Sequence, residues 1–191
     1  MLGIPGKIRP EAGLGPPWLA VVIGKIHFRS VTQMQERTMH TIHHLTAADG
    51  AWMSGMLDVF AEAFEDPEIY AARRPSAAYL QRLLGGDSFI GLVARVGEQV
   101  IGGLAAYVLQ KFEQERAEIY IYDLAVMAAH RRQGVATGLI RRLQEIGAER
   151  GAWVVFVQAD PPDTPAIRLY EKLGVREEVL HFDIPVRRPP H

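Results

Sequence analysis

The stretch from Glu118 to Gly138, EIYIYDLAVMAAHRRQGVATG, decides the fold of this chain. Its first half is aromatic and β-branched with alternating polar residues, which is typical of a β-strand. Its second half runs through two arginines to Gly134 and directly into a helical pattern. This order points backbone N–H groups and two cations at a helix N-terminus, where an anion binds favourably. The stretch therefore predicts a site for a phosphate-bearing ligand.

Strand and helix patterns continue on both sides of this stretch. Strands are predicted over 41–45, 88–96, 99–109, 117–126, 153–158 and 179–184, and helices from Asp49 to Pro67, over 76–84, from 135 to Gly151 and over 164–173. Gly97-Glu98 predicts a tight hairpin, and the continuous apolar run 153–158 predicts a buried strand. Together they predict an α/β (α+β) domain with a mixed central sheet and helices on both faces.

Length and composition limit the classes of function. The chain has 191 residues, which favours one domain, and its 21 Lys+Arg against 22 Asp+Glu give no basic field for nucleic acid. The absence of cysteine excludes disulfides and thiolate catalysis. Residues 18–23, the longest apolar run near the N-terminus, are too few for a membrane span. We expect a soluble, unprocessed, cytoplasmic protein with an N-terminal extension (1–38), a folded domain (39–186) and a tail (187–191).

Residues 131–136, RRQGVA, fit the pattern Arg/Gln-x-x-Gly-x-Gly/Ala. A helix that merely begins at a glycine and carries surface arginines would look the same. The strand before it, the amphipathic helix after it and the later phrase LYEKLGV (169–175) add context. Together they resemble the acetyl-CoA site of the GNAT superfamily of N-acetyltransferases, and this resemblance implies the GNAT acyltransferase fold with acetyl-CoA as acetyl donor.

Longer segments are similar to the gentamicin (aminoglycoside) 3-N-acetyltransferases. They are GGLAAYVLQKFEQERAEIYIYDLAV (102–126), HRRQGVAT (130–137), VQAD (157–160) and REEVLHFDI (176–184). The resemblance implies acetyl transfer to the 3-amino group of the deoxystreptamine ring, and thereby antibiotic resistance. Residues 65–78 depart from the family pattern. The alternatives are acetylation of a polyamine, a small amine or a protein amine, or an acyl-CoA-binding module without activity.

Acetyl transfer to an amine needs a base, because a primary amine is almost entirely protonated at pH 7. Regular alternation places Asp123 with Ile119 and Ile121 on an apolar face, where burial would raise the pKa of its carboxyl group. Asp123 is therefore the first candidate, although a structural carboxylate would fit as well. Glu118 is the second candidate, since a bulge near 124–126, as in this superfamily, would change the faces.

The resemblance also implies the residues that contact acetyl-CoA. A bulge would offer a backbone N–H of Leu124 or Ala125 to the thioester carbonyl and backbone groups near Val126 to the pantetheine arm. The full predicted set is Leu124, Ala125, Val126, Arg131, Arg132, Gln133, Gly134, Val135, Ala136 and Thr137. Tyr170 is predicted to protonate the leaving thiolate, and its alternative role is packing between helix and sheet.

An aminoglycoside carries several ammonium groups, so its pocket should be acidic. The predicted substrate-binding residues are Tyr122, Asp160, Glu178 and Asp183, and Asp160 and Asp183 are preferred among the carboxylates because both sit at strand ends. Ten carboxylates in all cluster in loops and strand ends, the others being Glu65, Asp66, Glu68, Glu113, Glu115, Asp163 and Glu177. His40, His43 and His44 predict a surface strand end rather than zinc, since no carboxylate follows at ligand spacing. We expect no bound metal, no nucleic-acid or membrane partner, and a chain compatible with homodimerisation.

Overall fold

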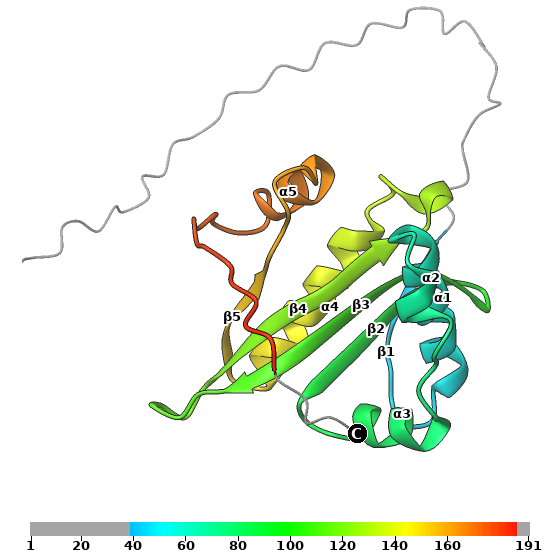
Figure 1. Ribbon diagram of the computed structural model, residues 1–191, viewed down its shortest axis with the longest axis horizontal. Helices are drawn as coiled ribbons and strands as arrows, with labels where there is room; N and C mark the ends of the chain where they lie inside the picture. The colour runs from blue at the N-terminus through cyan, green and yellow to red at the C-terminus, as the bar shows by residue number, and fades with distance from the viewer. Residues whose placement is uncertain (1–38, 187–191) are drawn as a thin grey trace, which may run out of the picture. The chain divides into compact units, whose positions relative to one another are not determined.

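A five-stranded mixed sheet forms the centre of the protein. The computed structural model describes residues 39–186, so the predicted extension (1–38) and tail (187–191) lie outside the described residues. The strands lie in chain order: β1 (Thr41–His44), β2 (Phe89–Val96), β3 (Gln99–Gln110), β4 (Ala117–Val126) and β5 (Ala152–Val157). The first four pair antiparallel, and β5 runs parallel to β4 (Figure 1).

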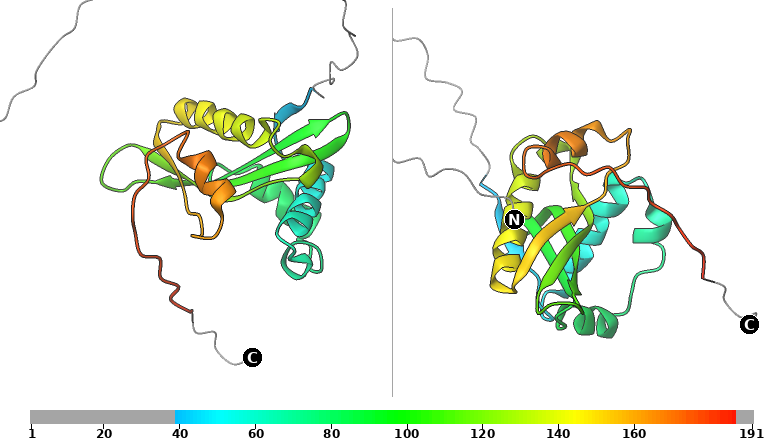
Figure 2. Two further views of the ribbon diagram at one scale, coloured as in Figure 1. Left: turned by 90° about the horizontal axis from the view of Figure 1, so that it is seen from above. Right: turned by 90° about the vertical axis from the view of Figure 1, so that its left-hand side faces the viewer.

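Helices cover both faces of the sheet, as Figure 2 shows from above. The helices are α1 (Gly50–Ala63), α2 (Pro67–Tyr70), α3 (Ala77–Leu84), α4 (Val135–Glu149), α5 (Thr164–Tyr170) and the 3-10 turn η1 (Ala128–His130). α4 packs on one face, and α1 and α3 pack on the other. The predicted mixed sheet with helices on both faces is confirmed.

Each face of the sheet has its own hydrophobic core. On α4, an apolar stripe at helical spacing is buried against one face and consists of Val135, Leu139, Leu143 and Ile146. On the other face, Met56 and Phe60 of α1 are nearly inaccessible to solvent. Burying a large apolar side chain stabilises the fold by about 1.5–3 kcal/mol. Both faces of the sheet are therefore anchored, and the uncovered part of the α1 face is free for function.

Local sequence signals set most of the helix and strand ends. The hairpin between β2 and β3 turns at Gly97, whose φ of +58° favours glycine. The Ser76 side chain accepts a hydrogen bond from the Tyr79 N–H and caps α3. Asp49 differs: its carboxylate accepts from Thr46 at 2.7 Å and contacts His43 at 3.2 Å rather than capping α1. Asp49 is the N-cap residue of α1, so the predicted start of this helix is confirmed, although its side chain makes no capping bond.

Three expectations are corrected at the C-terminal end of the chain. β5 is an edge strand rather than a buried one, because Trp153 and Val154 are 71% and 46% exposed. α5 ends at Tyr170, shorter than the predicted helix. Residues 179–184 form no strand, although their apolar and polar side chains alternate, since no neighbouring strand pairs with them in the described chain. Among the described residues, no helix has the length and apolar character needed to cross a membrane.

Candidate active site

A β-bulge in β4 changes which face its carboxylates occupy. Ala106 of β3 pairs with Ile121, and the next residue, Ala105, pairs with Asp123, so Tyr122 is an extra residue in β4. The bulge lies before Asp123, not at 124–126 as the superfamily pattern predicts. Ile119 and Ile121 belong to the core under α4, whereas Asp123 turns toward α2 on the other face. The prediction that Asp123 shares a face with these isoleucines is therefore wrong.

Asp123 lies in a partly buried site with a tyrosine as its partner. The Tyr70 hydroxyl donates to Asp123 Oδ1 at 3.0 Å. Burial raises the pKa of the Asp123 carboxyl group, and the bond from Tyr70 opposes that rise. Burial also raises the pKa of Tyr70, with the Asp123 charge adding to it, so the phenol stays protonated and donates. Among residues 39–186, no cation pairs with Asp123, and a carboxylate of raised pKa in such surroundings is suited to accept a proton.

The short helix α2 holds Tyr70 in place. The Asp66 side chain accepts from the Ile69 N–H at 3.1 Å, and Pro67 opens the helix. The Tyr70 ring packs on Phe60 and Phe64, at centroid distances of 5.7 and 5.5 Å. Sequence analysis did not identify Tyr70, because it lies 53 residues from Asp123 and in the segment that departs from the family pattern. The capping signal of Asp66-Pro67 predicts a helix there, but not its partner.

β4 and β5 separate just where the bulge begins. Their last paired residues are Ile121 and Val157, and Figure 1 shows β5 diverging from β4 beyond them. From Asp123 to Val126, β4 still pairs with β3 on one side, and in the described chain no strand pairs with it on the other. Backbone groups on such an edge are open to an amide-bearing ligand. This edge contains Leu124, Ala125 and Val126, three of the residues predicted to contact acetyl-CoA.

The basic loop after β4 fits a pyrophosphate. Gly138 N–H donates to Gly134 O at 2.9 Å and closes the first turn of α4, so the N–H groups of Val135, Ala136 and Thr137 have no acceptor within the helix. Gly134 has a φ of +84°, and a Cβ there would meet no atom within 4 Å. Glycine is needed here for the backbone conformation and not because a neighbouring atom leaves no space for a Cβ.

Side chains brace this loop against the end of β4. Arg131 Nε donates to the Val126 carbonyl at 3.0 Å, and Gln133 Nε2 donates to the Ala129 carbonyl at 3.1 Å. Arg132 takes a left-handed conformation, with φ of +61°, and its side chain is exposed. The loop therefore presents cationic groups and free N–H groups together, which suits a coenzyme A pyrophosphate.

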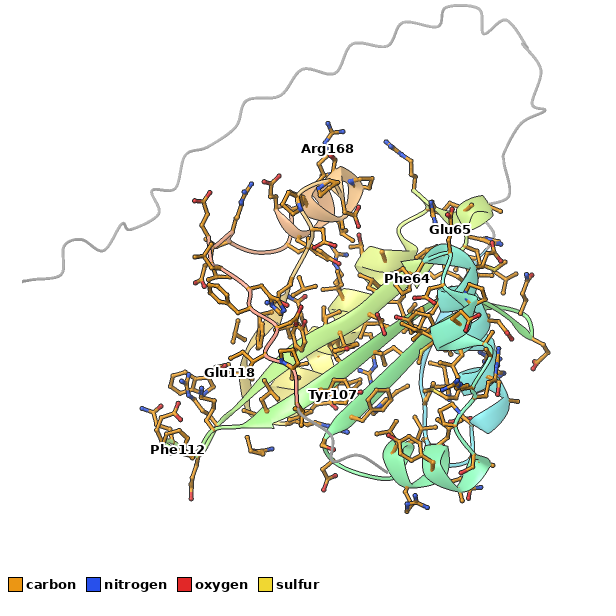
Figure 3. The ribbon with its side chains drawn as sticks, in the orientation of Figure 1. Phe64, Glu65, Tyr107, Phe112, Glu118 and Arg168 are labelled. Atoms are coloured by element: carbon orange, nitrogen blue, oxygen red, sulfur yellow. The ribbon has the colours of Figure 1, made fainter. Side chains whose placement is uncertain are left out.

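Glu118 lies near the start of β4, away from the bulge (Figure 3). Its carboxylate contacts Lys111 Nζ at 3.6 Å and Arg116 at 3.5 Å. Five residues of extended strand separate it from Asp123, a distance of about 16 Å. The structure therefore does not bring the two predicted bases into one site.

Tyr170, the predicted acid, is the last residue of α5. With its neighbours Leu169 and Leu173 it packs against the core under α4. Burial, with a smaller contribution from Asp163, raises the pKa of Tyr170 to about 12. The phenol therefore keeps its proton at neutral pH, and the packing predicted as its alternative role is observed as well.

Aromatic rings line the sheet face beside Asp123. The Tyr122 ring meets Tyr107 and Tyr120 edge to face, with centroids 5.7 and 5.9 Å apart. Tyr120 stacks on Phe156 of β5 at 5.1 Å. Tyr122 is 62% exposed and Tyr107, labelled in Figure 3, is 37% exposed, so this aromatic face is open to solvent. Tyr122, a predicted substrate-binding residue, lies at its centre.

The predicted substrate carboxylates have different surroundings. Asp183 contacts His181 Nε2 at 3.1 Å, and Glu178 contacts Arg176 at 3.7 Å. Asp160 is exposed in the turn before α5. Residues 158–186 contain six Asp and Glu residues and three Lys and Arg residues, so this segment is acidic. Glu113 instead belongs to the ion-pair cluster of Lys111, Arg116 and Glu118.

The histidines near β1 have structural partners. His43 Nε2 contacts Asp49 at 3.2 Å, and the His43 ring meets Trp52 edge-on. A carboxylate therefore does lie beside this histidine, although none was expected from the spacing in the sequence. Burial lowers the pKa of His44, and the positive charge of Arg150 lowers it further. In the part of the chain that the structure describes, no three His, Asp or Glu side chains come together as a metal site.

The chain belongs to the Acetyltransferase (GNAT) family, whose model matches residues 53–175. An aminoglycoside acetyltransferase from an uncultured soil metagenomic sample, known from a crystal structure, has 58% sequence identity to this chain. The two structures align with a TM-score of 0.76 over 78% of this chain and 99% of that one. Another such enzyme, solved in complex with sisomicin, is 31% identical, with a TM-score of 0.71 over 78% and 97% of the chains. N-acetyltransferase 8B of Rattus norvegicus is 25% identical over 151 residues, 72% of this chain and 67% of that protein.

Proposed function

We propose that this protein transfers the acetyl group of acetyl-CoA to an amino group of an aminoglycoside, and specifically to the 3-amino group of the deoxystreptamine ring. The observation that carries the proposal is the Asp123–Tyr70 pair, which lies beside the bulge where β4 loses its β5 partner. The 58% identity to an aminoglycoside acetyltransferase supports the choice of substrate class. The resemblance of residues 102–126 to 3-N-acetyltransferases supports the position on the ring.

The basic loop holds the donor. Bound acetyl-CoA supplies the acetyl group as a thioester. The N–H groups of Val135, Ala136 and Thr137 and the Arg132 side chain would bind its pyrophosphate, and the open edge of β4 would bind its pantetheine amides. A backbone N–H of Leu124 or Ala125 would donate to the thioester carbonyl oxygen.

Asp123 prepares the amine. An ammonium group bound beside it gives a proton to the carboxylate, which leaves the nitrogen lone pair free to attack. Tyr70 donates to the same carboxylate and so orients it. Tyr170 is a protonated phenol on α5 and is the candidate donor of a proton to the leaving sulfur. Positioning of the two substrates contributes alongside these groups, by as much as about 7–11 kcal/mol in well-oriented systems.

The acidic C-terminal segment and the aromatic face suit a polycationic sugar. Asp160, Glu178 and Asp183 offer carboxylates to ammonium groups, and the Tyr107 and Tyr122 rings offer faces to cations and sugar C–H groups. Charge attraction of this kind also speeds the encounter of a cationic substrate with the protein.

The test is acetyl-CoA-dependent thiol release with gentamicin, sisomicin, kanamycin, spermidine and a lysine peptide. We expect turnover with the aminoglycosides and little with spermidine or the peptide. NMR of the product would locate the acetyl group, and we expect it on the 3-amino group. Turnover of spermidine or the peptide alone would replace the aminoglycoside assignment, and acetylation at another amine would correct only the position.

A further inference from the structure

A chain of hydrogen bonds links the aromatic face to the C-terminal segment. The Tyr120 hydroxyl donates to Gln158 Oε1 at 3.0 Å, and Gln158 Nε2 lies 3.0 Å from His181 Nδ1. His181 Nε2 in turn lies 3.1 Å from Asp183 Oδ1. These residues come from β4, from the position after β5 and from the segment after α5. The acetyl-transfer roles assigned above give no function to Tyr120, Gln158 or His181.

Asp183, the last residue in this series of hydrogen bonds, fixes which group donates in each bond. The Asp183 carboxylate only accepts, so a neutral His181 must carry its proton on Nε2. His181 Nδ1 then accepts, and the Gln158 amide must turn its NH₂ toward it and its oxygen toward Tyr120. The reversed amide would need a proton on Nδ1 and would leave a bare Nε2 facing the carboxylate. With a neutral imidazole, only one arrangement satisfies all three contacts.

This arrangement commits the hydrogen of the Tyr120 hydroxyl to Gln158. A hydroxyl has one donor hydrogen and two lone pairs, so the Tyr120 oxygen keeps its lone pairs for another donor. Within residues 39–186, no side chain or backbone N–H donates to this oxygen. Burial raises the pKa of Tyr120, with Tyr122 and Asp123 adding to the rise, so the group stays a neutral hydroxyl.

The Tyr120 oxygen lies on the same side of β4 as the Asp123 carboxylate. Tyr120 pairs with Tyr107, and its ring packs against Phe156 and the bulged Tyr122. The bulge turns Asp123 toward this face as well. Two hydrogen-bond acceptors therefore flank Tyr122, and a ligand with neighbouring ammonium and hydroxyl groups can donate to both.

We propose that Tyr120 is a substrate-binding residue whose oxygen accepts a hydrogen bond from an ammonium group of the amine substrate. Gln158 and His181 are positioning residues, which hold the Tyr120 hydroxyl hydrogen in its bond to Gln158 so that the oxygen lone pairs face the substrate. The substrate class rests on the proposed function. The role of Gln158 does not depend on which amine is acetylated, because it follows from the donor order of the chain.

Kinetics of Tyr120→Phe, Gln158→Met and the double variant test this coupling. A hydrogen bond to a charged group accounts for about a 10- to 100-fold change in affinity, so Tyr120→Phe should raise the KM for gentamicin by about tenfold or more. Its kcat and its KM for acetyl-CoA should stay within about twofold of wild type. Gln158→Met should also raise the gentamicin KM, and the double variant should match Tyr120→Phe alone, because Gln158 acts through Tyr120. Gln114→Met, on the distant β3–β4 hairpin, is the matched control and should change neither KM.

Multiplying effects in the double variant, or an unchanged KM in Tyr120→Phe, would overturn the inference while leaving the proposed function intact. Failure of the wild-type protein to acetylate any aminoglycoside would overturn the proposed function instead. A substrate-free measurement then still decides the hydrogen-bond order. Nitrogen-15 NMR of the histidine side chains, at a pH where imidazole is neutral, should show His181 protonated on Nε2 in the wild type. Protonation on Nδ1 would refute the order of donors and with it the role of Gln158.

Discussion

Two carboxylates on one strand, Glu118 and Asp123, have opposite surroundings. Glu118 lies between Lys111 and Arg116, which both attract its negative charge. Asp123 has a neutral phenol as partner, and burial raises the pKa of its carboxyl group. The comparison teaches that two carboxylates on one strand can have different neighbours, and that partial burial beside a neutral group suits Asp123 to take up a proton.

A single inserted residue produces much of this difference. Without the Tyr122 bulge, Asp123 would face the apolar core under α4 with Ile119 and Ile121. With it, Asp123 reaches Tyr70 and the open edge of β4. The bulge thus converts a strand that would bury a charge into one that presents it to a ligand.

The largest expected effect is on catalysis by the Asp123→Asn variant. Asparagine can still accept the Tyr70 bond but cannot take a proton, so kcat/KM should fall by about 10²–10⁴-fold. Coenzyme A binding, measured by calorimetry, should stay unchanged. Because the pKa of Asp123 is raised in the folded protein, its ionisation lowers the stability of the fold as the pH rises through that pKa. Asp123→Asn should therefore unfold at an equal or higher temperature than wild type at neutral pH. Near-normal activity would give the base role to another group.

A smaller effect is expected where the donor binds, in Gly134→Ala. The φ of +84° disfavours any side chain, at about 1–2 kcal/mol. The first turn of α4 should shift and raise the KM for acetyl-CoA by about tenfold, with the aminoglycoside KM little changed. Gly138→Ala is the control, since its Cβ would meet neighbours only at 3.6 Å or more and helix propensity favours alanine. The same KM for acetyl-CoA in both variants would argue against a loop conformation that depends on Gly134.

The Tyr70→Phe variant tests the environment of Asp123 more finely. The bond from Tyr70 lowers the pKa of Asp123 and so partly offsets burial. Its loss should raise that pKa further and move the acidic limb of the kcat/KM profile to higher pH. Activity should therefore fall several-fold on the acidic side and recover at high pH. Tyr79→Phe, a half-exposed tyrosine of α3, should leave the limb in place. A limb displaced to lower pH would contradict the opposing effects of burial and Tyr70.

The smallest effect is expected for Glu118→Gln. Its ion pairs are partly exposed, so their loss should lower the free energy of unfolding by about 1 kcal/mol or less, and by less still in high salt. Activity should remain within about twofold of wild type. Urea denaturation at two salt concentrations, beside the kinetic assay, checks both statements.

Sequence patterns predicted the parts of the site that are local in the chain. The strand 117–126, Gly134 at the start of α4 and the buried stripe of α4 follow from periodicity and glycine chemistry within a few residues. The partner of Asp123 could not be predicted in this way, because Tyr70 approaches it only through the packing of α2 on α1. The bulge was expected, but its position depends on pairing with β3, which one strand alone does not reveal.

The C-terminal segment shows the same limit from the other direction. The sequence predicts a strand over 179–184, yet in the described chain no strand pairs with this segment. Its polar side instead bonds to Gln158 through His181. The local pattern of this segment does not reveal that contact.

The pH dependence of kcat/KM in wild type, Asp123→Asn and Glu118→Gln tests the central claim most directly. A limb from the amine of the substrate is common to all three proteins and cancels in their ratios. The account predicts that wild type and Glu118→Gln share an acidic limb from one proton, at a pH above the ordinary range of an aspartate, and that Asp123→Asn lacks it. An acidic limb that persists in Asp123→Asn and disappears in Glu118→Gln would contradict the account.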